Sequence, residues 1–201
     1  MNVAGAAPSS KSLARLALPA ILAVALALRL AFALVIPQPE NAVGDSVEYD
    51  LLARHVLAGQ GLTYGEPWLP SARRTPFYPV ALAATYWLFG LGDYKPLLVL
   101  QALADVVVVG LVGWLAGQAW QARRVGLLAA AGWALYLAGA QLTGRLLADS
   151  LFTSLLVAGV SLLVAAVREI GRRPRPGRPL LLAGLFGLLL GLASLARPTA
   201  L

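Results

Sequence analysis

Cysteine is absent from the 201-residue chain, histidine occurs once, and only 12% of the residues are charged. Without cysteine, the chain has no disulfide framework, no thiol nucleophile and no cysteine-bound zinc site. A single histidine also argues against a Ser-His-Asp triad or a histidine-rich metal centre. The charged fraction is about half of the roughly 25% that is usual in soluble domains. The composition is therefore not that of a soluble enzyme.

Apolar residues, in contrast, make up 59% of the chain and occur in long runs. A membrane-spanning helix needs about 20 consecutive, mostly apolar residues. We predict an all-α, polytopic membrane protein that forms a single transmembrane module over residues 1–201. A shorter apolar segment at residues 77–91 suits a re-entrant or interfacial helix better than a span. The five predicted spans are residues 16–36, 97–117, 125–140, 150–167 and 180–196.

The first span has an alternative interpretation, a cleaved signal peptide with Ala31-Phe32-Ala33 as its cleavage site. The apolar run is longer than that of a typical signal peptide, which favours a retained helix.

Basic residues outnumber acidic residues by 16 to 9, and many of them lie in short loops between apolar runs. Arg123 and Arg124 form one such loop, and five arginines between residues 168 and 178 form another. Cytoplasmic loops carry an excess of Lys and Arg. We therefore place both loops and the N-terminus on the cytoplasmic side of an inner or plasma membrane. Residues 77–91 then do not cross, and residues 37–96 and 141–149 face outward. This placement explains the basic charge without a nucleic-acid partner.

The predicted outer segment, residues 37–96, contains six of the nine acidic residues. Apolar residues at helical spacing predict an amphipathic surface helix over residues 46–58. Asp45, at the start of this helix, has two interpretations. It is either an N-cap whose capping box is closed by Glu48, which the spacing favours, or a catalytic carboxylate.

Three pairs of charged residues also leave alternatives open. Arg73 and Arg74, before Pro76, bind either lipid headgroups or the phosphate of a lipid-linked substrate. Arg145 and Asp149 are spaced to form an ion pair within a helix, or to place both charges at the mouth of an outer cavity. Arg29 and Asp105 lie inside predicted spans, where ionisable residues are functional candidates. Because the Arg29 side chain can extend outward and Asp105 lies in the outer half of its span, a packing ion pair between them is the favoured interpretation.

These residues form an ordered pattern. Gly44-Asp45 follows the first span with Tyr49 and Ala53, and is followed by Gly59-x-Gly61. The motifs Arg74-Thr-Pro76-Phe-Tyr78-Pro79, Arg145-Leu-Leu-Ala-Asp149 and Leu195-Ala-Arg197-Pro198-Thr199 come next. In order and spacing, the pattern resembles the N-terminal half of GT-C superfamily glycosyltransferases. The most similar group is glycosyltransferase family 39, which contains protein O-mannosyltransferases and aminoarabinose transferases.

The resemblance implies a GT-C-like module that transfers a sugar from a polyprenyl-phosphate donor to an acceptor glycan, lipid or protein at the outer membrane face. Asp45 matches the family's essential carboxylate and Asp149 matches its second acidic position. The family often has adjacent acidic residues at the first position, whereas here Ser46 follows Asp45 and Glu48 becomes the second candidate. A divalent cation, Mg²⁺ or Mn²⁺, held by Asp45 and Asp149 belongs to the same expectation. The candidate substrate-binding residues are Arg73, Arg74, Tyr78, Arg145 and His55.

Members of this family are usually more than twice as long, so we expect this chain to be an incomplete enzyme. Two other functions remain open. A non-catalytic scaffold or lipid-carrier-binding module would agree with the short length. A transporter component would use Arg29 and Asp105 along its pathway, although the sequence shows no inverted repeat.

Overall fold

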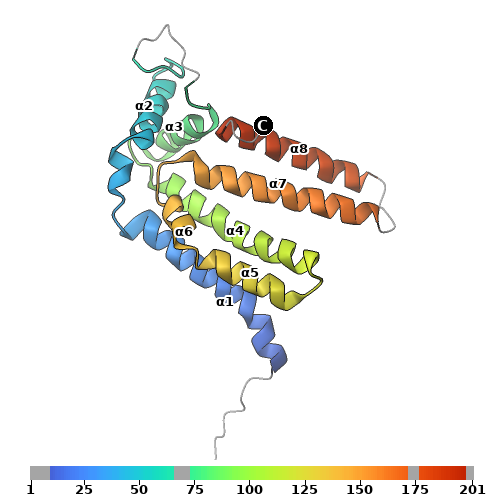
Figure 1. The fold of residues 1–201 in the computed structure, drawn as a ribbon. Coiled ribbons are helices and arrows are strands. Elements are labelled where there is room, and N and C mark those ends of the chain that lie inside the picture. Colours follow the sequence, from blue (N-terminus) through green and yellow to red (C-terminus); the bar gives the residue numbers. More distant parts are fainter. Residues whose placement is uncertain (1–9, 66–72, 172–176, 198–201) are drawn as a thin grey trace, which may run out of the picture.

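The computed structural model describes residues 10–65, 73–171 and 177–197, with side chains from Leu16 onward. The regular elements among these residues are all helices, with no strand, which confirms the predicted all-α class. Long helices lie side by side in a bundle, and two shorter helices lie together at one of its ends (Figure 1). The bundle contains α1 (Ser10–Leu30), α4 (Lys95–Ala119), α5 (Arg123–Ala134), α7 (Ala148–Ile170) and α8 (Arg178–Ala196), and the two shorter helices are α2 (Asp45–Leu57) and α3 (Phe77–Phe89).

Four helices are long and apolar enough to cross a membrane: Leu16–Val35, Lys95–Ala119, Ala148–Ile170 and Arg178–Ala196. The predicted span at residues 125–140 is not one straight helix. Its place is taken by α5 and the short α6 (Leu137–Thr143), which are bent by 57°. The number of spans is thus four, or five if this bent pair forms one span. At 13 residues, α3 is about 20 Å long and falls short of the roughly 30 Å hydrocarbon core.

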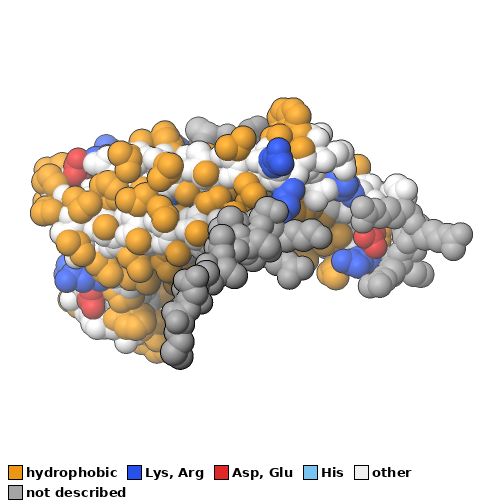
Figure 2. Space-filling model, turned by 90° about the horizontal axis from the view of Figure 1, so that it is seen from below, with side chains coloured by type: hydrophobic (Ala, Val, Ile, Leu, Met, Phe, Trp, Pro, Cys, Tyr) orange, Lys and Arg blue, Asp and Glu red, His pale blue; other side chains and the backbone are white. Residues whose placement is uncertain are grey.

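The two ends of the bundle differ in charge. The ends of α4 and α7 and the starts of α5 and α8 lie at one end, which we call the basic end because Arg123, Arg124, Arg168 and Arg178 lie there. The opposite end, the α2–α3 end, also contains the α6–α7 connection and the end of α8 (Figure 1). Figure 2 shows apolar side chains over the middle of one face, with charged side chains toward its ends. This distribution suits a bundle whose middle lies in hydrocarbon.

Small residues allow α4 and α5 to approach closely. A Cβ atom added to Gly126 would lie 2.5 Å from the carbonyl oxygen of Gly113, so these two backbones leave no room for a side chain. Close contact between small residues is a common source of packing energy between helices in membranes.

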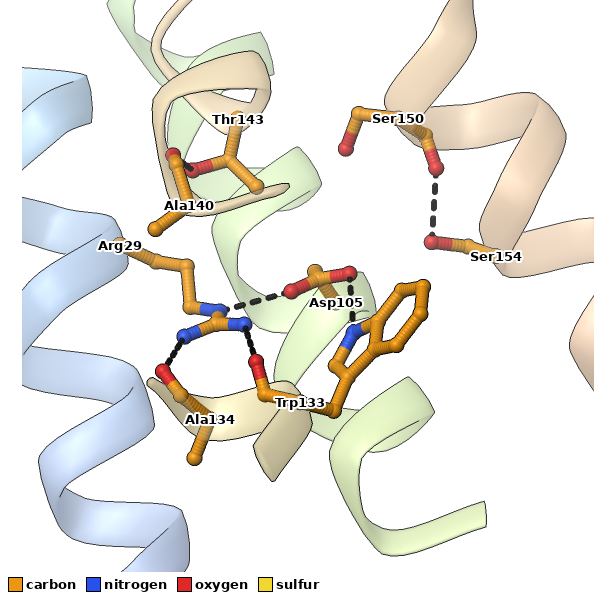
Figure 3. Close-up of polar contacts among 8 residues, drawn as sticks. All are labelled: Arg29, Asp105, Trp133, Ala134, Ala140, Thr143, Ser150 and Ser154. Carbon is orange, nitrogen blue, oxygen red and sulfur yellow. Dashed lines mark hydrogen bonds and ion pairs between the residues drawn. The ribbon is translucent and has the colours of Figure 1, made fainter. Parts of the chain in front are cut away.

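A buried ion pair joins three helices beneath the bend (Figure 3). Arg29 of α1 is fully buried, and its Nε donates to Asp105 Oδ2 of α4 at 2.7 Å. Its two terminal nitrogens donate to the carbonyl oxygens of Ala134 at 2.6 Å and Trp133 at 2.9 Å. Carbonyl groups at a helix C-terminus lack partners within the helix, so Arg29 satisfies those exposed by the break after α5. The expected Arg29–Asp105 pair is confirmed.

Candidate active site

The start of α2 places two carboxylates at the α2–α3 end. Gly44 precedes the helix with a φ of 60°, a conformation that favours glycine, and Asp45 is the first helical residue. The N-cap interpretation of Asp45 is therefore wrong, since Gly44 occupies that position and no side chain caps the helix. Asp45 instead pairs with Arg74, and hydrogen bonds between charged groups are about twice as strong as neutral ones.

Arg74 is the centre of this cluster. Its Nη1 donates to Asp45 Oδ2 at 3.0 Å, its Nη2 donates to Asp45 Oδ1, and its Nε donates to Glu48 Oε2 at 2.8 Å. The guanidinium carbon lies 5.5 Å from the centre of the Tyr49 ring, within range of a cation–π interaction. Arg73 Nη2 contacts the second Glu48 oxygen at 2.9 Å. The structure thus brings together four of the predicted site residues.

The cluster changes the acidity of its members. Hydrogen bonding from Arg74, aided by the charges of Arg74 and Arg73, lowers the pKa of Glu48 below its ordinary value, although burial opposes the shift. Burial also disfavours the charge of Arg74, but its hydrogen bonds to Glu48 and Asp45 outweigh this cost and raise its pKa. Burial raises the pKa of Tyr49. Near neutral pH, Glu48 and Arg74 are therefore charged and Tyr49 is neutral.

A second pair faces this cluster from α7 and α8. Arg197, which follows α8, donates to Asp149 Oδ1 in the first turn of α7. The Oγ1 of Thr75 donates to the Ala196 carbonyl oxygen at 2.7 Å. This hydrogen bond connects the segment that contains Arg74 to the end of α8. In the sequence, Arg197 follows the last predicted span directly and belongs to the motif Leu195-Ala-Arg197-Pro198-Thr199, but it was not assigned a site role.

The predicted Arg145–Asp149 pair is wrong. Arg145 Nη2 contacts Glu40 Oε1 at 2.5 Å instead. Arg145 precedes the start of α7 at Ala148, and Leu147 between them has an extended backbone. The spacing that brings side chains together within a helix therefore does not apply.

One cavity of about 230 Å³ unites the two charged groups. Four of the predicted site residues, Asp45, Arg73, Arg74 and Asp149, line it. The sequence did not assign a site role to three further lining residues that matter chemically, Tyr49, Thr75 and Arg197.

The other predicted substrate-binding residues lie elsewhere. Tyr78 is fully buried and packs edge-on against Tyr49, with ring centres 4.8 Å apart. His55 lies near the end of α2, where its Nδ1 is 2.6 Å from the Thr63 carbonyl oxygen. Neither residue lines the cavity, and neither does Arg145. Tyr78 supports the wall formed by Tyr49.

Two amide side chains position the connection that leads to Asp149. Asn41 Nδ2 donates to the Gly144 carbonyl oxygen, and Asn41 Oδ1 accepts from the Leu146 N–H, both at 2.9 Å. From α4, Gln101 Nε2 donates to the carbonyl oxygens of Thr143 at 3.2 Å and Arg145 at 3.0 Å. These bonds satisfy the irregular backbone before α7 and fix where the first turn of that helix begins.

The predicted metal ligands, Asp45 and Asp149, both line the cavity. The described part of the chain contains no group of three or more His, Asp or Glu side chains that could hold a metal. Asp45 and Asp149, the predicted ligands, both face arginine guanidinium groups.

The geometry can bind an anion and move a proton. Arginines recognise phosphate through several N–H groups at once, and a carboxylate can accept a proton from a nearby hydroxyl.

Comparison of the chain with models of protein families, with curated proteins and with solved structures finds no match.

Proposed function

We propose that the chain is a membrane glycosyltransferase, or the N-terminal part of one. In this proposal it transfers a sugar from a polyprenyl-phosphate donor to an acceptor glycan, lipid or protein. The carrying observation is that one cavity at the α2–α3 end combines the carboxylates of Asp45 and Asp149 with three arginines. The basic end lies in the cytoplasm, and the cavity opens on the outer face of the inner or plasma membrane.

The arginines bind the donor phosphate. The phosphate is a good leaving group, so its developing charge needs cations more than a strong acid. Arg74 and Arg197 line the cavity, and their present partners are carboxylates. A bound phosphate competes with Asp45 for the guanidinium group of Arg74, while Glu48 continues to hold the Nε of that arginine. Donor binding thereby frees Asp45 beside the substrate.

Asp45 then acts as the general base. It accepts the proton of an acceptor hydroxyl or amine, which is a poor nucleophile until that proton is removed. The acceptor atom forms a bond to the anomeric carbon from the side opposite the phosphate. The bond from this carbon to the phosphate oxygen breaks, and its electron pair leaves with the polyprenyl phosphate. The configuration at the anomeric carbon is inverted. Asp149 has a positioning role through Arg197.

A non-catalytic module that binds the lipid carrier is the second candidate. The observation that favours it is that Asp45 and Asp149 are both paired with an arginine. Transport has less support, because Arg29 and Asp105 are buried inside the bundle. They form hydrogen bonds with each other and with α5.

Replacing Asp45 tests the catalytic proposal. We expect Asp45→Asn to lower sugar transfer about 100- to 10,000-fold, the usual contribution of a general base, while donor binding persists. The measurement is transfer of labelled sugar from polyprenyl phosphate in membranes that contain the complete protein. Asp93→Asn is the matched control, because Asp93 is an exposed carboxylate that does not line the cavity.

If Asp45→Asn folds and retains normal transfer, the assignment of the base is wrong. If the wild-type protein binds the carrier but transfers no sugar, the binding module is the better description.

A further inference from the structure

A cavity of about 410 Å³ lies at the basic end of the bundle, where α4 ends, α5 begins and α1 packs beside them (Figure 1). We call it the α4–α5 cavity. Its volume is within the range of roughly 300–1,000 Å³ that is usual for small-molecule sites. It shares no lining residue with the charged cavity at the opposite end of the bundle, so it is a separate feature of the fold.

One face of α4 forms the long wall of this cavity. The residues of this wall are Gly110, Gly113, Trp114, Gly117 and Gln118. Their spacing of three and four residues puts them on the same face of the helix. The three glycines account for the hollow, because they have no side chain to fill it. A Cβ atom added to Gly110 would meet no atom within 4 Å, so the space beside this residue is open.

The lining changes from apolar to polar along the cavity. Gly110 and Gly113 lie toward the middle of the bundle, whereas Gln118, Gln121 and Arg123 lie at or near the turn between α4 and α5. The eight residues from Gly110 to Gln118 rise about 12 Å along α4. The apolar and polar ends of the cavity are therefore well separated, as in a site for an amphiphilic molecule.

The charge at the polar end is positive. Arg123 lines the cavity, and none of the lining residues is acidic. The sequences of α1 and α5 contain no Asp or Glu, and the single acidic residue of α4, Asp105, is held by Arg29. Arg123 is also the first residue of α5, where the positive end of the helix dipole adds to its charge. The polar end thus favours an anion.

Two tryptophans flank this end. Trp114 lines the cavity, and Trp120, at the end of α4, is 69% exposed. Tryptophan is enriched at the level of lipid headgroups, where one part of its ring is in water and the other in hydrocarbon. Their positions suit a cavity whose polar end lies among the headgroups and whose apolar end lies in the hydrocarbon.

We propose that the α4–α5 cavity binds one anionic phospholipid of the cytoplasmic leaflet. Arg123 pairs with the headgroup phosphate, the Gln118 amide donates to headgroup oxygens, and one acyl chain lies along the glycines of α4. A soluble anion matches only the polar end and an uncharged lipid matches only the apolar end, whereas an anionic lipid matches both. The inference is independent of the proposed function, because it uses no residue of the charged cavity.

The test compares an anionic with a zwitterionic lipid. Binding of dioleoyl phosphatidylglycerol and of dioleoyl phosphatidylcholine to the full chain in detergent is measured by native mass spectrometry. We expect the wild-type protein to bind phosphatidylglycerol about fivefold more tightly, the effect of one arginine near an anionic headgroup. Arg123→Gln should remove most of this preference. Arg124→Gln is the matched control, because Arg124 is the next residue, is exposed and does not line the cavity. It should keep the preference.

A second variant tests the position of the acyl chain. Gly110→Leu fills the apolar end without a clash, since the space beside Gly110 is open. It should lower the affinity for phosphatidylglycerol about tenfold, the effect of excluding about two methylene groups, while circular dichroism shows an unchanged helix content. Gly184→Leu on α8 is the matched control, because its surroundings are equally open and it does not line the cavity. It should leave the affinity unchanged.

Three outcomes overturn the proposal. The first is equal affinity of the wild-type protein for the two lipids, which would mean that the cavity does not select an anion. The second is a normal preference in folded Arg123→Gln or a normal affinity in folded Gly110→Leu, either of which would place the bound lipid elsewhere. The third is competition by glycerol 3-phosphate at the concentration of the lipid, which would show that the site binds a soluble anion.

A further measurement uses the wild-type protein alone. A phosphatidylglycerol with a photoreactive group in its acyl chain should label peptides that contain residues 110–127. Labelling confined to other parts of the chain would contradict the proposal.

Discussion

The Arg29–Asp105 pair and the cluster around Arg74 use the same arginine–carboxylate chemistry in different surroundings. Inside the bundle, Arg29 and Asp105 are buried, and the hydrogen bonds of the pair extend to α5. At the α2–α3 end, Arg74 holds Asp45, whose side chain is 51% exposed and faces a cavity. The inner pair has no room for another partner, whereas the Asp45–Arg74 pair can be exchanged for a ligand.

Energetics explain why only one of these clusters suits binding. Removing one partner of a buried ion pair leaves an uncompensated charge, which costs about 3–5 kcal/mol. An exposed pair contributes only about 0–1 kcal/mol, because water and salt compete with it. The inner pair therefore stabilises the join between α1, α4 and α5. The outer pair costs little to open, as a binding site requires.

The largest expected effect comes from breaking the inner pair. We expect Asp105→Leu to lower the free energy of unfolding by about 3–5 kcal/mol, because Arg29 stays buried and Trp133 Nε1 loses its acceptor. Circular dichroism during unfolding in detergent measures the change. Asp149→Leu, at the exposed pair with Arg197, should cost less than about 1 kcal/mol.

The double variant Arg29→Leu/Asp105→Leu sharpens this result. Removing both charges should restore most of the lost stability, since no buried charge remains. Equal losses in Asp105→Leu and Asp149→Leu would show that burial does not distinguish the two clusters.

An intermediate effect is expected where the connection from α6 to α7 crosses the first helix. A Cβ atom on Gly144 would overlap the Phe32 carbonyl oxygen, so Gly144→Ala must displace the backbone that leads to Asp149. We expect a loss of about 1–3 kcal/mol in unfolding free energy, typical of overpacking. Gly132→Ala is the control, because the space around Gly132 is open. Similar stability of the two variants would argue against close packing at Phe32.

The smallest expected effect concerns pH and the Glu48–Arg74 contact. The pKa of Glu48 is lowered in the folded protein from its ordinary value of about 4.5, so its ion pair stabilises the fold above that pH. This contribution disappears as the pH falls through the lowered pKa. We expect Glu48→Gln to be less stable than wild type by under about 1 kcal/mol at pH 7, with the difference shrinking as the pH falls through the lowered pKa of Glu48.

Unfolding followed from pH 7 to pH 3 measures this difference. In an Arg74→Ala background the difference should shrink at every pH, because the main cause of the lowered pKa is gone. A difference that does not shrink as the pH falls would assign the effect of Glu48 to packing.

The sequence predicted features that depend on local pattern or on depth. Apolar runs gave the all-α class, and similar depth gave the Arg29–Asp105 pair. It could not predict that Arg145 binds Glu40 or that Asp149 binds Arg197, because these partners are 105 and 48 residues apart. The bend after α5 was also missed. Its carbonyl groups are satisfied by Arg29 from another helix, and no residue near Leu135 signals that contact.

The hydrogen bond from Thr75 to Ala196 has a consequence for the time at which the cavity can form. Its walls come from residues 45–49, 73–75, 148–149 and 196–197, so the first wall is synthesised about 150 residues before the last. At roughly 5–20 residues per second, this separation is about 8–30 s. During that interval Arg74 can already bind Asp45 and Glu48, whereas Asp149 has no partner in the cavity until Arg197 has been synthesised. The ribosome therefore completes the charged cavity only after the last apolar helix has been made.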